Sequence, residues 1–394
     1  MKFGIITKEE YDAFWNNYYR KSFINTSQMA NVKEKENYKV SYLGLKKNNE
    51  LIGASILVSI KSHFGKYDFY SPRGFLIDYN NKDLIKIYTE YVKNFVKENN
   101  GYEFRIDPYI VNVSRDGEGK IVDGIDNRWL NDYLKKLGYK HISNKNAEQG
   151  VVWMYALDTR DETEDSIMRK IKPRTRTLIR KTLKSGIKIR SLKRNELNLF
   201  KQIMDETGKN KNFKVRSLSY YESMYDIFSK NNNIKFLIAE INLKDYIENI
   251  NNEICDAKNK KQIDNSHIES LNRKILNAKK LREKYGDNIT LSGAMFILIK
   301  PEVVFLYGGN YEEFMDFNAQ YILQWEMIKY AVNNKYDRYN FYGISGNFNK
   351  DDKEYGVYDF KSRFGGYTEE LIGEYAYPTS FIYYIINLIR RFRK

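Results

Sequence analysis

The chain has 394 residues, of which 42% are hydrophobic and 15% aromatic, and this composition excludes an intrinsically disordered protein. Its formal net charge of +15 fits a polyanionic partner such as RNA, anionic lipid or a diphosphate-bearing precursor, although a generally basic solvated surface gives the same total. A single cysteine, Cys255, excludes an internal disulfide, and three scattered histidines do not supply the Cys/His ligand set of a structural zinc site.

Residues 1–150 are predicted to form a mixed α/β unit. Apolar residues at helical spacing predict helices over residues 8–21, 83–98 and 126–137, and β-forming segments predict strands over 38–46, 51–60, 66–70 and 102–106. The N-terminal residues lack the apolar core of about 7–15 residues that marks a signal peptide. No apolar run approaches the roughly 18 residues of a membrane-spanning helix, so we expect a cytoplasmic protein.

A second unit begins near Val151, where residues 151–157 predict a strand. Residues 165–185 are predicted to be helical and divided at Pro173, because proline interrupts the hydrogen bonds of a helix. Helices over residues 194–206 and 219–229 and a strand over 234–241 follow. The order strand–helix–strand thus occurs twice without a residue-level repeat, which predicts duplication of a fold rather than of a sequence.

The hydrophobic period changes after Leu243. Apolar residues then recur at steps of three and four in two segments with polar residues between them: Leu243, Ile247, Ile250, Ile254 and Ala257, then Ile268, Leu271, Ile275 and Ala278. This pattern predicts an antiparallel coiled-coil helical hairpin over residues 242–286. We expect it to project as an arm from the second unit.

Residues 381–394, FIYYIINLIRRFRK, predict an aromatic and aliphatic helix whose end carries the cations Arg390, Arg391, Arg393 and Lys394. Two interpretations stay open. In the first, the helix packs on the first unit, with its cations at the negative end of the helix dipole. In the second, it lies at the surface of an anionic lipid membrane, where each cation gains about 1 kcal/mol.

The segment over residues 303–366 holds the most informative pattern. A short strand ends at Gly308-Gly309, a helix covers residues 320–334, an aromatic strand begins at Tyr339, and a loop leads to Lys361. The blocks FLYGG, QWEMIKYA, YNFYGISG and VYDFKSRFGG, in this order, resemble the C-terminal signature of the Fem aminoacyltransferases. Members of that family move an amino acid from aminoacyl-tRNA onto the peptide stem of a cell-wall precursor.

The resemblance implies two acetyltransferase-like (GNAT-type) α/β domains, with the coiled-coil arm inserted in the second. We expect the first domain to comprise residues 1–150 plus 376–394, the second 151–241 plus 287–375, and the arm 242–286. The implied partners are aminoacyl-tRNA and a peptidoglycan precursor, either lipid II or UDP-MurNAc-pentapeptide, with peripheral contact with the inner membrane face left open. No cofactor and no metal are implied.

The resemblance also marks residues that would bind the precursor. Lys33 matches a lysine that contacts phosphate, and Arg216, four residues before Tyr220, matches an arginine that holds phosphate or carboxylate. Met29 stands where the family usually has tryptophan, which leaves the local packing open. Without the resemblance, Lys33 is one of many surface lysines and Arg216 an ordinary helix-start arginine. Two further candidates for shaping the pocket are Tyr70 and Tyr307.

The transfer step points to Asp107 and Lys361. Asp107, held in extended backbone before Pro108, matches an aspartate that faces the acceptor amine, although a turn aspartate is the alternative. Phe360-Lys361 matches the Phe-Lys pair of the family, whose lysine stabilises the oxyanion formed when an amine attacks an ester. An aminoacyl ester is already activated, so no covalent enzyme intermediate is required.

A run of cations between residues 170 and 190 is the candidate tRNA site. The residues that we assign to it are Arg176, Arg180, Lys181 and Lys184. A spacing of four places Arg176, Arg180 and Lys184 on one helix face, which can bind an RNA backbone without reading its sequence. A solvated helix face is the alternative.

Two other functions compete with aminoacyl transfer. The first is acyl transfer from coenzyme A, but the chain has no copy of the (R/Q)-x-x-G-x-(G/A) pyrophosphate loop of such enzymes. The second is non-catalytic RNA binding through the basic segment and the arm. An RNA-binding protein of that kind would keep its binding after replacement of Lys361 and Asp107 and would form no amine product.

Overall fold

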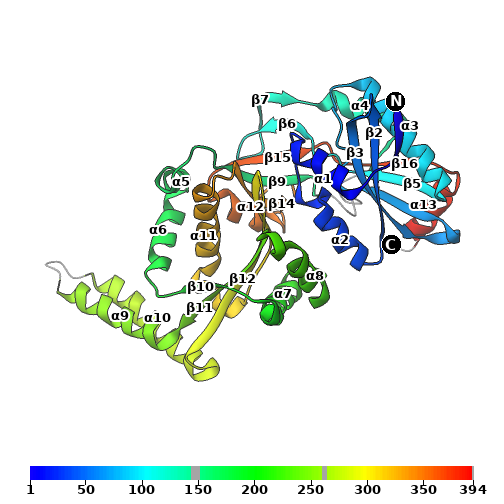
Figure 1. Cartoon of the computed structure of the whole chain (residues 1–394). Coiled ribbons are helices and arrows are strands. Elements are labelled where there is room, and N and C mark those ends of the chain that lie inside the picture. The colour runs from blue at the N-terminus through cyan, green and yellow to red at the C-terminus, as the bar shows by residue number, and fades with distance from the viewer. Residues whose placement is uncertain (143–150, 260–263, 393–394) are drawn as a thin grey trace.

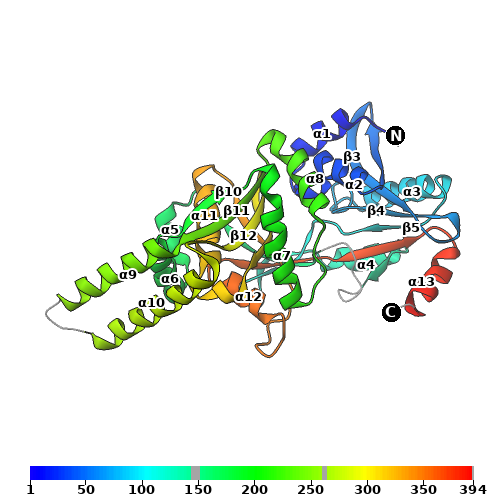
Figure 2. The same ribbon diagram turned by 90° about the horizontal axis from the view of Figure 1, so that it is seen from below.

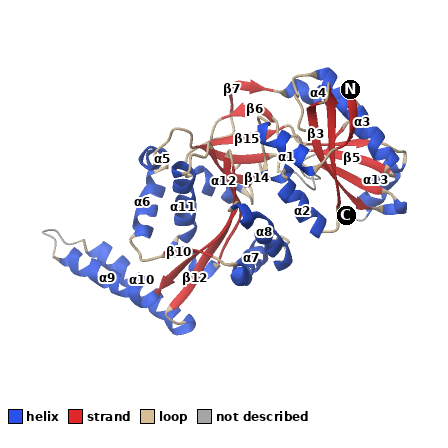
Figure 3. Ribbon diagram, in the orientation of Figure 1, coloured by secondary structure: helices blue, strands red, loops and turns tan. Residues whose placement is uncertain are grey.

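The computed structural model describes residues 1–142, 151–259 and 264–392. Two α/β lobes, each built on one open sheet, lie side by side, and a pair of helices projects from the second lobe (Figure 1). Both sheets carry helices on their faces (Figure 3). The predicted mixed α/β fold class is confirmed.

Within the described residues, seven strands form the sheet of the first lobe, in the order β1-β2-β3-β4-β5-β16-β8. Strands β4 and β5 run parallel, whereas the other neighbours are antiparallel. The strands are β1 (Lys2–Ile5), β2 (Lys39–Lys47), β3 (Glu50–Lys61), β4 (Tyr67–Ser71), β5 (Gly101–Ile106), β8 (Lys140–Ile142) and β16 (Glu374–Pro378).

Helices cover both faces of this sheet because its strands alternate their apolar side chains. Ile56 of β3 packs in a cluster with Tyr11 of one helix, whereas its neighbour Leu57 packs on the opposite face with Tyr88 and Val92 of another. The helices of the first lobe are α1 (Lys8–Asn17), α2 (Ser27–Lys35), α3 (Lys82–Glu98), α4 (Arg128–Lys136) and α13 (Ile382–Phe392).

Helix α3 shows how local sequence determines such an element. Its buried residues Leu84, Tyr88, Val92 and Val96 recur every four positions, and the Asn81 side chain accepts a hydrogen bond of 3.0 Å from the Leu84 amide at the helix start. The helix predicted over residues 83–98 is therefore confirmed.

The second sheet contains nine strands of the described chain, in the order β10-β11-β12-β13-β14-β9-β15-β6-β7. Its parallel pair is β13 and β14, so each lobe has one parallel pair inside an otherwise antiparallel sheet. The strands are β6 (Val111–Arg115), β7 (Ile121–Asp126), β9 (Trp153–Asp158), β10 (Lys188–Ser191), β11 (Ile234–Asn242), β12 (Asn288–Ile299), β13 (Glu302–Asn310), β14 (Arg338–Ile344) and β15 (Tyr367–Leu371).

Two helix layers sandwich the middle of the second sheet. Leu237 of β11 packs toward one layer and the adjacent Ile238 toward the other. The predicted division at Pro173 is confirmed, since one helix ends at Lys170 and the next begins at Pro173. The helices of this lobe are α5 (Glu164–Lys170), α6 (Pro173–Leu183), α7 (Leu197–Lys211), α8 (Leu218–Phe228), α11 (Ala319–Asn333) and α12 (Tyr355–Ser362).

The two sheets are interleaved along the chain. Strands β6 and β7, within residues 111–126, pair in the second sheet, although the sequence assigned them to the first unit. Strand β16 returns to the first sheet and pairs between β5 and β8. Since the strands exchange between lobes in this way, the domain limits near residues 150 and 376 stay a prediction.

A helical hairpin forms the projecting arm. Helices α9 (Leu243–Lys258) and α10 (Asn265–Tyr285) lie side by side in both views (Figure 1, Figure 2). Ile250, Ile254 and Leu271 are buried between them, at positions of the predicted apolar repeat. The bases of the helices meet where the Leu243 amide donates to the Asp287 carbonyl over 2.7 Å. Supercoiling of the pair stays a prediction.

Two helices were not predicted. Residues 27–35, for which the sequence predicted phosphate contact but no secondary structure, form α2, whose N-cap Thr26 accepts from the Met29 amide over 3.1 Å. Lys361, predicted to follow a loop, lies on α12. Among the described residues, no helix is both long enough and apolar enough to cross a membrane.

Candidate active site

A cavity of about 110 Å³ lies where α2 of the first lobe meets α8 of the second. Residues of both lobes line it, and they include five that the sequence singled out: Lys33, Tyr70, Arg216, Tyr220 and Tyr307. Its wall also contains Phe23, Ile24, Met29, Leu306 and Tyr342. The fold thus gathers side chains that lie far apart in the sequence, from Phe23 to Tyr342.

The cavity opens where strands β13 and β14 separate. These parallel strands pair over residues 302–304 and 338–340. Beyond that register, Leu306 and Tyr307 of β13 and Tyr342 of β14 line the cavity. Crevices outside the carboxyl ends of parallel strands are common ligand sites in α/β proteins.

Two cations border this cavity, and one carboxylate lies between them. Lys33, near the end of α2, pairs with Glu36 at 2.8 Å between Nζ and Oε2. Arg216, just before α8 in the other lobe, approaches the second oxygen of Glu36 at 3.7 Å. Glu36 therefore bridges the lobes and occupies a place that an anionic ligand group can take.

Aromatic rings support the arginine. The Arg216 guanidinium lies 4.8 Å above the Tyr220 ring, and the Tyr220 and Tyr307 rings meet edge to face at 6.4 Å. Burial raises the pKa of Tyr220 well above its usual range, so its phenol stays neutral. This wall offers stacking surface beside a fixed positive charge.

Asp107 lies behind Tyr70 rather than on the cavity surface. It follows β5, is 3% exposed, and accepts hydrogen bonds of 2.8 Å from the Tyr70 hydroxyl and 2.6 Å from the Arg73 amide. The Arg73 guanidinium pairs with its other oxygen at 3.2 Å. Burial raises the pKa of Asp107, and the contacts with Arg73 and Tyr70 act in the opposite direction.

Two residues that the sequence did not single out have left-handed backbone at this place. Arg73 has φ +58° in the turn after β4, and Tyr342 has φ +65° in β14, where the Asn340 side chain accepts from its amide over 2.8 Å. Such values are rare for bulky residues and concentrate at functional sites. Burial raises the pKa of Tyr342 to about 12, while nearby Arg73 acts to lower it. The only sequence feature that could have pointed to them is the segment in which each one lies: SPRG for Arg73 and YGISG for Tyr342.

Lys361 reaches the same region from α12. Its ammonium donates to the Gly343 carbonyl over 2.5 Å, one residue beyond Tyr342, and its side chain is buried. Burial lowers the pKa of Lys361 to about 7. About half of the Lys361 side chains are therefore protonated at neutral pH, and burial of the charged form lowers the stability of the folded protein.

Phe360 does not reach the cavity. Its ring packs against Tyr321 at 5.1 Å and Phe364 at 5.6 Å, at the edge of the core of the second lobe. The structure therefore places Phe360 where it supports α12, one residue before the lysine.

Arg176, Arg180 and Lys181 lie on α6, and Lys184 is the residue that caps its C-terminal end. Ile179 and Thr182 face the core, whereas Arg180, Lys181 and Lys184 are exposed and Arg176 is half-buried. A groove of about 520 Å³ runs between α6 and the arm, and its lining includes the cations Lys181, Arg273 and Lys274. A positively charged groove of this kind suits a phosphate backbone.

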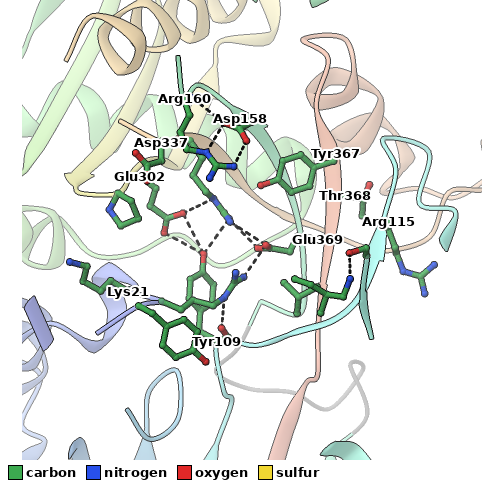
Figure 4. A pocket seen from close by; sticks show the side chains of 17 residues that line it. Lys21, Tyr109, Arg115, Asp158, Arg160, Glu302, Asp337, Tyr367, Thr368 and Glu369 are labelled. Carbon is green, nitrogen blue, oxygen red and sulfur yellow. Dashed lines mark hydrogen bonds and ion pairs between the residues drawn. The ribbon is translucent and has the colours of Figure 1, made fainter. Parts of the chain in front are cut away.

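A second cavity, of about 360 Å³, lies on another part of the lobe boundary (Figure 4). Arg20 of the first lobe pairs with Glu369 at 2.9 Å, and Arg338 pairs with Glu369 at 3.0 Å and with Glu302 at 3.1 Å. Burial alone would raise the pKa of Glu369, but Arg338 and Arg20 outweigh it and lower that pKa to about 2. Each of these charges thus has an oppositely charged partner, and the pair of Arg20 with Glu369 holds the two lobes together.

Within residues 1–142, 151–259 and 264–392, no group of three His, Cys, Asp or Glu side chains is placed to hold a metal ion. The candidate site therefore consists of cations, tyrosines and one buried carboxylate, a set suited to acyl transfer by positioning and electrostatic stabilisation.

The sequence profile of the FemAB family matches residues 6–391. The chain belongs to the FemAB family. It is 30% identical to the aminoacyltransferase FemA of Staphylococcus aureus strain NCTC 8325, over 96% of this chain and 95% of that protein, and equally to FemA of strain MW2. The predicted resemblance is confirmed, and the protein is an aminoacyltransferase.

Solved structures agree with the family. A crystal structure of FemX matches with a TM-score of 0.77 and 25% identity, over 98% of this chain and 99% of that one. A tandem GNAT protein from the clavulanic acid biosynthesis pathway matches with a TM-score of 0.54 at 7% identity, over 96% of this chain and 98% of that one. The second likeness confirms the fold alone, namely a tandem acetyltransferase-like architecture in this FemAB protein.

Proposed function

We propose that this FemAB protein transfers an amino acid from aminoacyl-tRNA to the side-chain amine of the stem peptide in a peptidoglycan precursor, and so builds an interpeptide bridge. The observation that carries the proposal is the cavity between the lobes. Lys33 and Arg216 border it, and tyrosine side chains form part of its wall. The buried Lys361 lies nearby. Family membership supports aminoacyl transfer. The acceptor and the tRNA donor are our inference.

The acceptor enters between Lys33 and Arg216. The diphosphate of lipid II or of UDP-MurNAc-pentapeptide replaces the Glu36 carboxylate between these cations, and Arg216 grips it through two hydrogen bonds. Tyr220 and Tyr307 then form the wall along which the stem peptide lies. This arrangement directs the acceptor amine toward Tyr70 and Tyr342.

In the reaction, the amine attacks the ester carbonyl and a carbon–nitrogen bond forms. The Lys361 ammonium stabilises the oxyanion that develops on the carbonyl oxygen. The amine proton passes to the Tyr70 oxygen while Tyr70 gives its own proton to Asp107, whose pKa is raised by burial. The bond between carbonyl carbon and ribose oxygen then breaks, and the proton returns from Asp107 through the Tyr70 hydroxyl to the ribose oxygen.

The tRNA body lies along the groove between α6 and the arm. Arg176, Arg180, Lys181 and Lys184 contact its phosphates and carry no sequence information of their own. We place the protein in the cytoplasm, with peripheral contact with the inner membrane face where a lipid-linked acceptor is available.

The test is incubation of the protein with a mixture of aminoacyl-tRNAs and each precursor form, followed by mass spectrometry of the precursor. We expect a mass increase equal to one amino-acid residue on one of the two acceptors. The reaction should slow by about 10²–10³-fold in Lys361→Met, whereas tRNA binding should persist.

Three outcomes would contradict the proposal. The first is equal product from free amino acids with ATP. The second is tRNA binding with no product on either acceptor, which would favour the non-catalytic RNA-binding function. The third is an acyl product formed from an acyl-coenzyme A donor instead of aminoacyl-tRNA.

A further inference from the structure

The outward side of α13 is apolar. Phe381, just before the helix, is 75% exposed, and Tyr384, Ile385 and Leu388 are 53%, 41% and 54% exposed. Their spacing of three and four residues places them on one side of the helix. We call these four residues the terminal apolar face. Ile386, on the other side, is fully buried where the helix meets β5.

The start of α13 is fixed to the first sheet, and this fixes the direction of the terminal apolar face. The Thr379 amide donates to the Tyr102 carbonyl over 2.9 Å, and the Thr379 hydroxyl donates to the Gly101 carbonyl over 3.0 Å. The Ser380 amide also donates to the Tyr102 carbonyl, over 3.2 Å. The helix therefore starts beside the first residues of β5, at the edge of the first lobe (Figure 2). The exposed fractions of the four residues show that its apolar side faces solvent.

Charge follows this face in the sequence. No acidic residue follows Glu374 in the sequence, and the last five residues include four cations. A further exposed aromatic ring belongs to the same end of the sheet: Phe64, 65% exposed, lies between Lys61 and Lys66. The Ser62 hydroxyl of that loop approaches the Tyr102 hydroxyl at 3.5 Å, so one tyrosine joins both segments.

We propose that the terminal apolar face docks on an anionic lipid bilayer. An interfacial helix buries large apolar side chains among the acyl chains and keeps cations at the headgroups, and both groups are present here. A second copy of the chain would meet the face with the same cations, so like charges would oppose that contact. The proposed function includes contact with the membrane, and the terminal apolar face would be the surface that makes it. The biological role of this docking therefore rests on the proposed function.

Co-sedimentation of the full-length protein with vesicles tests this docking. We expect binding to vesicles of phosphatidylglycerol and phosphatidylcholine and none to phosphatidylcholine alone. Leu388→Glu should weaken binding at least tenfold. The matched control is Leu276→Glu, because Leu276 on α10 is 57% exposed and undergoes the same change of size and charge. Thermal unfolding should be equal for the two variants.

Four outcomes would overturn the inference. They are absence of wild-type binding, equal binding to neutral vesicles, equal behaviour of the two variants, and a wild-type dimer that Leu388→Glu converts to monomer. The assay measures no transfer, so a failure here leaves the transferase proposal intact. Conversely, an inactive protein that still binds anionic vesicles contradicts only the proposed function.

Discussion

The two lobes touch through two ionic contacts of opposite character. In the cavity of Figure 4, Arg20 of the first lobe pairs with Glu369 of the second lobe. Glu369 and Glu302 both pair with Arg338, and these three side chains are at most 13% exposed. At the other cavity, Glu36 is 27% exposed, Arg216 is 50% exposed, and their separation is 3.7 Å. We call the first contact the buried network and the second the Glu36 bridge.

The difference in burial gives the two contacts different roles. The buried network holds the lobes together, whereas the Glu36 bridge can be exchanged for a ligand. A buried charge cannot lose its partner without a large cost, so the buried network fixes how the lobes sit. An exposed, loose ion pair is worth about 0–1 kcal/mol, so a phosphate can replace Glu36 between Lys33 and Arg216 at little cost. The lobe boundary is therefore rigid at one place and open to ligand at the other.

Removal of Glu369 should break the buried network. We expect Glu369→Ala to lower the free energy of unfolding by about 3–5 kcal/mol, because Arg338 and Arg20 lose their shared partner in a buried place. Urea denaturation followed by circular dichroism measures this change. Glu370→Ala, next on the same strand and paired with Arg115 at a half-buried site, is the matched control and should cost much less.

Acid should produce the same loss in the wild type. The pKa of Glu369 is lowered from 4.5 to about 2, so its stabilising contribution is complete above about pH 4.5 and disappears as the pH falls toward 2. The difference between wild type and Glu369→Ala should shrink over that range. A difference that stays constant would show that the network stabilises through packing rather than charge.

Lys361 contrasts with Glu369. We expect its buried charge to serve the reaction rather than the stability of the fold. Lys361→Met should lower kcat by about 10²–10³-fold through loss of the oxyanion contact. The free energy of unfolding should stay equal or rise, because methionine is buried at less cost than an ammonium. Single-turnover transfer assays and urea denaturation measure the two effects, with exposed Lys353→Met as control. Loss of both activity and stability would make Lys361 a structural residue.

The pH dependence of transfer sharpens the role of that charge. With a pKa of about 7, Lys361 is charged below neutrality and keeps roughly one tenth of its charge at pH 8. The rate of the wild type relative to Lys361→Arg, which stays charged, should fall about tenfold per unit above pH 7. A constant ratio between pH 6 and 9 would refute a catalytic ammonium at this position.

The smallest effect is expected at the Glu36 bridge. Glu36→Gln should tighten the binding of inorganic pyrophosphate about twofold to fivefold, because the competing carboxylate is removed, and should change the free energy of unfolding by less than about 1 kcal/mol. Isothermal titration at low and high salt measures this, and salt should reduce the difference. Exposed Glu34→Gln, two residues away on α2, removes the same charge and should leave binding unchanged.

Short-range patterns in the sequence were sufficient for much of the fold. The period of α3, the break at Pro173 and the apolar repeat of the arm are each set by neighbours along the chain. The pairing of β6 with the second sheet was not predictable from such patterns, since Arg115 meets Glu370 across 255 residues. Helix α12 was missed because its sequence, YGVYDFKS, contains glycine and aromatic residues, and packing of Tyr358 on the core supports it.

The candidate site shows the same limit. Family resemblance led to five residues of the cavity border, since each lies in a recognisable motif. Arg73 and Tyr342 were missed because the left-handed backbone that aims them is normally signalled by glycine or asparagine. Glu36 was missed because its importance comes from Arg216, a residue of the other lobe. Only tertiary contacts could show that Asp107 lies behind Tyr70.

The exchange of strands between lobes bears on how the protein is made. The first sheet needs β16, at residues 374–378, and the second needs β15, at residues 367–371, which pairs with both β6 and β9. Neither sheet can close on the ribosome until nearly the whole polypeptide has emerged. Truncation by even a few dozen C-terminal residues would therefore leave both lobes incomplete. During synthesis, the sheet of the N-terminal lobe stays incomplete until the C-terminal segment has been made.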